Sequence, residues 1–128
     1  MNYWIIPSNP KFYNTKDAFK DLKVVQWQQG RTKSIEIGDI IFIYEGGENQ
    51  SIIIKSEVID KDVERHFIDD EPYYVGQQTF NAPWMTLLLI KKYPDNLITF
   101  DSLKAVGVKG NIQSPRRIDQ KIITQLNL

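Results

Sequence analysis

The segment Ser34–Gly47 reads Ser-Ile-Glu-Ile-Gly-Asp-Ile-Ile-Phe-Ile-Tyr-Glu-Gly-Gly and determines the fold that the sequence predicts. Its second half, Ile40–Tyr44, is an unbroken run of β-branched and aromatic residues that is followed by Gly46-Gly47. An apolar run of this length between turns is typical of a strand that is buried on both faces. Gly38, in the Gly-Asp turn before it, suits a position with positive φ. We therefore predict that this strand is the centre of a small barrel, with the functional surface on the loops at its ends.

Length and composition indicate one compact domain over residues 1–128. The chain has 41% hydrophobic and 25% charged residues, which is ordinary for a globular protein that forms a core without disulfides. There is no cysteine, and His66 is the single histidine. These counts exclude thiolate metal sites and argue against a histidine-based metal site or a catalytic triad. We expect no metal, no cofactor and no catalytic residue.

Charge and hydropathy restrict the partners that the chain is expected to have. The formal net charge is zero, so nucleic acid would have to be bound by a local basic patch. No apolar run approaches the roughly 20 residues of a membrane span, and the N-terminus lacks a signal-peptide pattern. We expect a cytoplasmic domain without a membrane partner.

Further short elements are predicted on both sides of the central strand. Two prolines, Pro7 and Pro10, are expected to end a first strand that begins at Tyr3, because neither donates to a ladder. Other predicted strands span 24–27, 51–59, 85–90 and 97–100, helices span 15–22 and about 101–106, and a last helix begins at Asp119. Residues 71–83 are predicted as an ordered loop, with or without a short strand, and residues 108–117 as a loop. Five or six mostly antiparallel strands with about three short helices indicate an α+β, partly closed barrel.

Few segments carry a signal for chemistry. No Gly-rich phosphate loop, nucleophile elbow or metal-ligand spacing is present. The charged run Asp60–Asp70 is interpreted as a solvated face rather than a carboxylate cluster, because its charges have both signs. Trp27 has two interpretations: it covers one end of the barrel, or it is a platform on which a flat ligand stacks. Arg31 and Lys33 beside it suit a phosphate backbone.

Several segments, taken in order, resemble an EVE domain of the PUA-like superfamily, which is related to the YTH readers of methylated RNA. The resemblance spans nearly the whole chain. It rests on Tyr3–Pro10, on Trp27 after the first predicted helix, and on Ile37–Tyr44, Pro83-Trp84, Ile98–Lys104 and Gln113–Ile118.

The resemblance implies a pseudo-barrel that binds a modified base flipped out of nucleic acid. In such domains two tryptophans help to form an aromatic pocket, and they correspond here to Trp27 and Trp84. The resemblance also implies that Ser8 and Tyr44 lie at this pocket. Alanine in place of either tryptophan is expected to abolish binding and to leave the fold largely intact.

The first turn gives a more specific resemblance. Pro7 and Asn9 stand where the family more often has charged residues, as in EVE-like domains at the N-terminus of Mcr-type, modification-dependent restriction proteins. This implies a nucleic-acid partner that carries a modified base, DNA rather than RNA, together with nuclease or ATPase subunits of a restriction system.

Physical chemistry is consistent with a base receptor. Enclosing a small methyl group requires an aromatic site, and stacking contributes about 1–3 kcal/mol per base. Flipping the base costs a few kcal/mol, which phosphate contacts must offset. Ser8 and Asn9 are candidates to read the base edge, or they only form an Asx-type turn. The candidate phosphate contacts are Lys11, Arg31, Lys33, Arg116 and Arg117; the two adjacent arginines alternatively lie at the surface without this role.

Three functions remain open from the sequence. The first is a non-catalytic reader of a modified base, with a methylated base as the expected ligand. The second is a PUA-like RNA-binding module that acts on tRNA or another structured RNA. The third is an enzyme that acts on a small molecule in the same cleft, although no nucleophile–base pair or paired carboxylates stand out near the tryptophans.

Overall fold

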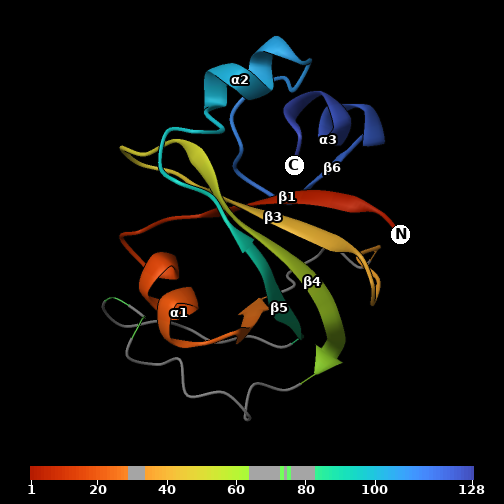
Figure 1. The fold of residues 1–128 in the computed structure, drawn as a ribbon. Helices are drawn as coiled ribbons and strands as arrows, with labels where there is room; N and C mark the ends of the chain where they lie inside the picture. The colour runs from red at the N-terminus through yellow and green to blue at the C-terminus, as the bar shows by residue number, and fades with distance from the viewer. Residues whose placement is uncertain (29–33, 64–72, 74, 76–82) are drawn as a thin grey trace.

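The computed structural model describes residues 1–28, 34–63, 73, 75 and 83–128 (Figure 1). One six-stranded sheet, in the order β2-β5-β4-β3-β1-β6, and three short helices make up the described part of the chain. The predicted α+β class with a partly closed barrel is confirmed. The elements are β1 (Tyr3–Ser8), α1 (Thr15–Asp21), β2 (Val24–Gln28), β3 (Ile40–Glu45), β4 (Ser51–Val63), β5 (Trp84–Lys92), α2 (Phe100–Ala105), β6 (Arg116–Ile118) and α3 (Gln120–Leu126).

The sheet curls so that its two faces carry separate cores. The helices α2 and α3 lie together on one side of the sheet, and α1 lies on the other (Figure 1). Neighbouring strands pair antiparallel except β1 and β3, which are parallel. The interior core beside α1 contains Ile6, Ile41 and Phe19, whereas the core beneath α2 and α3 contains Phe42 and Leu103.

The central strand is buried as the sequence predicts. All six residues of β3 are buried, and Gly38 in the preceding turn has a φ of +94°. Ile35 is fully buried and Ile37 is 60% exposed, but both precede the strand, which begins at Ile40. The positive φ of Gly38 allows the tight turn that leads the chain into β3.

The first strand is longer than predicted. β1 continues through Pro7 to Ser8 and pairs with β3 along its whole length, whereas β6 pairs only with Tyr3–Ile5. Pro7 thus lies beyond the residues of β1 that pair with β6. Its missing N–H therefore interrupts no hydrogen bonds between β1 and β6. The prediction that this strand ends before Pro7 is wrong for this reason.

Helix caps follow local signals with one exception. Asn14 Oδ1 accepts from Asp17 N and begins α1, and Asp119 begins α3, as predicted. The cap of α2 is Thr99, whose Oγ1 accepts from Ser102 N at 3.1 Å, and not the Asp-Ser pair that follows it.

Other predicted segments also differ or cannot be compared. Residues 97–100 form no strand but only an isolated bridge of Thr99 with Ser51, because Thr99 caps α2 and Phe100 begins it. β4 extends to Val63, and β6 occupies the end of a segment that was predicted as a loop. Most of the predicted charged run 60–70 and of the loop 71–83, with His66, lies outside the described residues. In the part of the chain that is described, no helix combines the length and the hydrophobicity needed to span a membrane.

Asp39 joins the N-terminus to the turn that begins β3. Asp39 is 2% exposed, and its carboxylate accepts hydrogen bonds from Asn2 N, Trp4 Nε1 and Glu36 N, each at 2.9 Å. Burial alone would raise the pKa of Asp39, but these three donors outweigh it, so the pKa lies below its ordinary value. The ionised carboxylate therefore fixes the start of β1 against the start of β3.

Asp39→Asn should lower the free energy of unfolding by about 2–4 kcal/mol at pH 7, because an amide has one acceptor oxygen for three donors, of which the Trp4 indole is buried. The folded-state pKa is lowered, so the ionised group stabilises the fold above the unfolded-state pKa of about 4. This contribution is lost as the pH falls through the folded-state pKa. The difference between wild type and variant should therefore shrink on acidification. Urea unfolding at several pH values measures it.

The matched control is Asp60→Asn, since Asp60 is an exposed aspartate on β4. It should change stability by no more than about 0.5 kcal/mol. Equal stability of wild type and Asp39→Asn at pH 7 would contradict the role of Asp39.

Candidate functional site

An open cleft lies where the end of β1 meets β2 and the start of β5. Its volume is about 260 Å³. We call it the Trp27 cleft. Aromatic rings and polar groups from three parts of the chain line it, namely Pro7, Ser8, Asn9, Phe12, Tyr13, Trp27, Gln28 and Trp84. Four residues that the sequence analysis proposed for a base site are thus brought together.

The pairing of β2 with β5 makes the two tryptophans neighbours on adjacent strands. Trp27 pairs with Met85, and Gln28 pairs with Trp84. Trp27 is half-buried and packs against the interior core, and its ring meets Tyr13 edge-to-face at 5.4 Å and 79°. The ring of Trp27 therefore has one side on protein and part of its surface available to a ligand.

The two indoles are not equivalent. Residues in register share a face of a sheet and successive residues alternate, so the pairing places Trp27 with Met85 and Trp84 with Gln28 on the opposite face. Trp84 is 2% exposed. It forms part of the wall of the cleft but offers little surface for stacking. The expectation that alanine at position 84 leaves the fold intact does not agree with this burial.

Ser8 and Asn9 differ in how much of their hydrogen-bonding capacity is already used. Ser8 is 5% exposed, and its Oγ lies 2.5 Å from Thr15 Oγ1 of α1. Asn9 is exposed, and its Oδ1 accepts from Lys11 N at 2.9 Å in an Asx turn. Of these two residues, only Asn9 presents its side chain to solvent at the rim of the cleft.

The structure does not bring Tyr44 to this cleft, which corrects the placement expected from the sequence. Tyr44 pairs with Pro7, whereas Ser8 pairs with the next residue of β3, so the two side chains leave opposite faces of the sheet. Tyr44 packs in the core beneath α2, with its ring 6.5 Å from Phe100. Desolvation by burial raises the pKa of the Tyr44 hydroxyl, and the charge of Asp101 adds to this.

The candidate phosphate contacts are scattered. Arg31 and Lys33 lie outside the described residues, and Lys11 is exposed beside Asn9. Arg116 donates to the carbonyl oxygens of residues 109 and 111, and Arg117 donates to Asn2 Oδ1 at 2.7 Å.

The two arginines are also distant from the cleft. Arg117 pairs with Trp4, four residues before Ser8, which is about 13 Å along a strand. Of the described candidates, Lys11 is the one near the cleft.

Sequence reasoning missed two aromatic residues of the cleft. Tyr13 is buried against Trp27, and Phe12 is 55% exposed at the rim. Both follow the Pro-Ser-Asn-Pro turn that the resemblance already placed near the site. An adjacent aromatic pair between a turn and a helix cap was the available signal.

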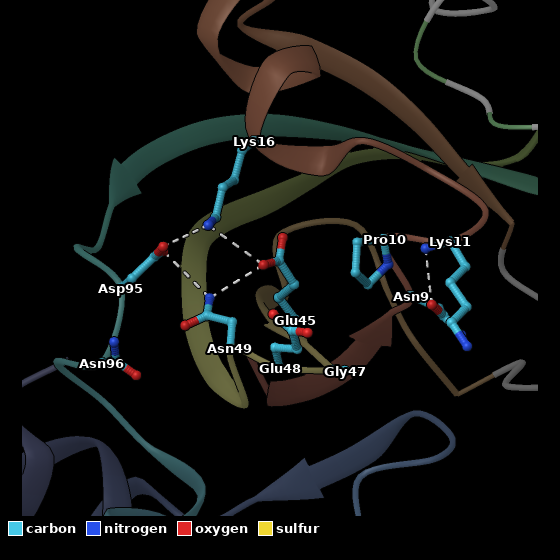
Figure 2. A pocket seen from close by; sticks show the side chains of 11 residues that line it. Asn9, Pro10, Lys11, Lys16, Glu45, Gly47, Glu48, Asn49, Asp95 and Asn96 are labelled. Carbon is cyan, nitrogen blue, oxygen red and sulfur yellow. Dashed lines mark hydrogen bonds and ion pairs between the residues drawn. The ribbon is translucent and has the colours of Figure 1, made fainter.

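A second, larger cleft lies on the other side of the turn around Asn9. It has a volume of about 600 Å³, and we call it the polar cleft (Figure 2). Its centre is an ion-pair network: Lys16 Nζ lies 2.6 Å from Asp95 Oδ2 and 3.4 Å from Glu45 Oε1, and Asn49 Nδ2 donates to both carboxylates. The hydrogen bond with Asp95 is the largest cause of the raised pKa of Lys16.

The charges of the polar cleft do not favour a phosphate. It is lined by two lysines and three carboxylates, and Lys16 is already paired with two of the three. No three His, Asp or Glu side chains gather as possible metal ligands in the described part of the chain. The Trp27 cleft is therefore the better candidate for a planar ligand, although it is smaller.

Solved structures with the same architecture span nearly the whole chain. Rpa0253 from Rhodopseudomonas palustris and Atu2648 from Agrobacterium tumefaciens are each 14% identical over 98% of this chain and 90% of theirs, with a TM-score of 0.62. An ASCH protein from Zymomonas mobilis is 19% identical over 98% of this chain and 93% of its own, with a TM-score of 0.62. These similarities establish an α+β pseudo-barrel.

The family is shown by the sequence profile of the EVE domain, which matches residues 2–121. The chain therefore belongs to the EVE domain family, as the resemblance implied. No curated protein matches it at a significant level.

Trp84→Ala should lower the free energy of unfolding by about 3–5 kcal/mol, as expected for truncating a buried tryptophan. Trp27→Ala should cost less, about 1–2 kcal/mol, because its ring is only half-buried. Chemical denaturation of both variants beside wild type measures the difference. A larger loss for Trp27→Ala than for Trp84→Ala would contradict the burial of the two rings described above.

Proposed function

We propose that this chain binds nucleic acid and takes a modified base, flipped out of its strand, into the Trp27 cleft. The observation that carries the proposal is the partly exposed ring of Trp27 in an open cleft with Phe12 and Tyr13. A volume of about 260 Å³ is below the roughly 300–1,000 Å³ of drug-sized ligand sites. It suits one flat ring system rather than an extended ligand.

Aromatic walls support the choice of a base as the ligand. Every base has a π-face, and stacking on an aromatic side chain contributes about 1–3 kcal/mol. A base inside a duplex cannot reach such a cleft, so the target must be single-stranded or flipped. A methyl group adds a small apolar surface that a site with aromatic walls can enclose, which supports a methylated base.

The residues of the cleft favour binding without catalysis. Its described lining contains no carboxylate and no histidine. Ser8 Oγ has the hydroxyl of Thr15 as its partner and not a general base. We therefore propose a binding domain in which specificity, and not bond cleavage, is the task of the cleft.

The identity of the strand and of further partners rests on the resemblance. The Pro-Ser-Asn-Pro turn resembles domains of modification-dependent restriction proteins, so we propose DNA before RNA as the target. In that setting the domain would direct a nuclease or ATPase subunit to modified sites. A stronger affinity for structured RNA than for any modified DNA would instead favour the RNA-binding alternative.

Trp27→Ala should weaken binding of a modified oligonucleotide about 5- to 150-fold, because one stacking contact is lost. The measurement is a fluorescence-anisotropy titration against single-stranded DNA and RNA with N6-methyladenine, 5-methylcytosine or unmodified bases. Wild type should prefer one modified strand over its unmodified counterpart.

Tyr44→Phe is the matched aromatic control, since Tyr44 lies in the other core. It should bind as wild type does. Equal binding of all oligonucleotides by wild type and Trp27→Ala would refute the proposed function.

Lys11→Gln should weaken binding of modified and unmodified strands by the same factor. Loss of one phosphate contact should also reduce the slope of log K against log salt concentration by about one. Titrations between 50 and 200 mM salt measure the slope. Arg117→Gln, in which the altered side chain bonds Asn2 far from the cleft, should leave the slope unchanged. A slope that changes with Arg117→Gln and not with Lys11→Gln would place the nucleic acid near β6.

A further inference from the structure

Asn9 lines both clefts, and Figure 2 shows it at the edge of the polar cleft. Pro10 follows it and restricts its backbone to extended conformations. Its carbonyl oxygen accepts hydrogen bonds from Phe12 N at 2.9 Å and from Tyr13 N at 3.1 Å. The main chain of Asn9 is therefore fixed at the rim of the Trp27 cleft.

The hydrogen bond from Lys11 determines which way the side-chain amide of Asn9 faces. Lys11 N lies 2.9 Å from Asn9 Oδ1 (Figure 2). A backbone N–H only donates, so the atom opposite it must be the amide oxygen. The Nδ2 group, with its two N–H donors, remains for other partners, and it has none among the described residues. Because the Asx turn engages the amide oxygen of Asn9, the part of the side chain that a ligand can meet is the donor group Nδ2.

The neighbouring hydroxyl of Ser8 does not offer a ligand an acceptor beside this donor. Ser8 Oγ is buried and already shares a hydrogen bond with Thr15 Oγ1 at 2.5 Å. The indole of Trp27 has a donor and no acceptor. The rim of the cleft near Asn9 is therefore able to recognise an acceptor on a ligand.

We propose that Asn9 is a specificity-determining residue that donates a hydrogen bond from Nδ2 to an acceptor on the Watson–Crick edge of the bound base, an inference that rests on the function proposed above. Flipped bases are read at that edge. In adenine and cytosine the acceptor is the ring nitrogen beside the exocyclic amine. A methyl group on the amine or on a ring carbon leaves this nitrogen free. A methyl group on the nitrogen itself removes its lone pair and makes the ring cationic. Asn9 therefore favours bases that are methylated on the amine or on a ring carbon, and it disfavours bases that are methylated on this ring nitrogen.

Asn9→Asp tests this with little change in shape. The carboxylate still accepts from Lys11 N, but a second acceptor with a negative charge replaces the donor. The probes are single-stranded DNA with N6-methyladenine or 5-methylcytosine and the isomeric strands with N1-methyladenine or N3-methylcytosine. Wild type should bind the better strand of the first pair about 10-fold more tightly than its ring-nitrogen isomer. Asn9→Asp should lose this preference and favour the cationic isomer.

Two further variants separate charge from hydrogen bonding. Asn9→Ser has a hydroxyl that can accept from Lys11 N, and it replaces the two amide donors with one O–H on a shorter side chain, which does not reach the position of Nδ2, without adding charge. It should lose the preference without gaining affinity for the cationic base. Asn96→Asp adds the same charge at an exposed residue that lines the polar cleft and not the Trp27 cleft. It should keep the wild-type preference. Thermal unfolding of each variant shows that the fold is retained.

The outcomes distinguish this inference from the proposed function. If Asn9→Asp and Asn9→Ser keep the wild-type preference while Trp27→Ala loses binding, the role of Asn9 is overturned and the base receptor stands. If wild type and Trp27→Ala bind all four strands equally, the base receptor fails, and the role of Asn9 fails with it.

Discussion

The parallel pairing of β1 with β3 is the constraint on which the rest of the structure depends. It fixes the face on which each residue of both strands lies, because side chains alternate along a strand. Ile6 and Ile41 thereby enter the interior core beside α1, whereas Phe42 enters the core beneath α2 and α3. The carboxylate of Asp39 holds this pairing at its start, because it accepts from Asn2 and Trp4 at the start of β1 and from Glu36 in the turn before β3. Ser8 consequently reaches the Trp27 cleft, and Tyr44 does not.

Local signals in the sequence predicted most of the elements. A run of apolar residues is sufficient for β3, a glycine with positive φ for the turn before it, and Asn14 and Asp119 for two helix caps. These features depend on neighbours within a few residues. The three-residue strand β6 and the continuation of β1 through Pro7 depend instead on which strands lie alongside. Segments this short contain no periodic pattern from which either feature could be predicted.

The candidate site was predictable in its composition and not in its geometry. The resemblance brought Trp27 and Trp84 together, and both line the Trp27 cleft. Their unequal exposure follows from that register, which the sequence does not contain. Arg117 resembles a free phosphate contact until the structure shows its bond to Asn2 Oδ1. Whether a charged side chain is available to a ligand is decided by tertiary partners.

The helix α1 links the two clefts through adjacent residues. Thr15 bonds Ser8 in one, and Lys16 pairs with Asp95 and Glu45 in the other. With seven residues, α1 is shorter than the roughly 12–15 residues below which an isolated helix is marginal. Its order therefore comes from these anchors and from its buried face. The first two residues of this one short helix thus each hold a side chain of a different recess, Thr15 in one and Lys16 in the other.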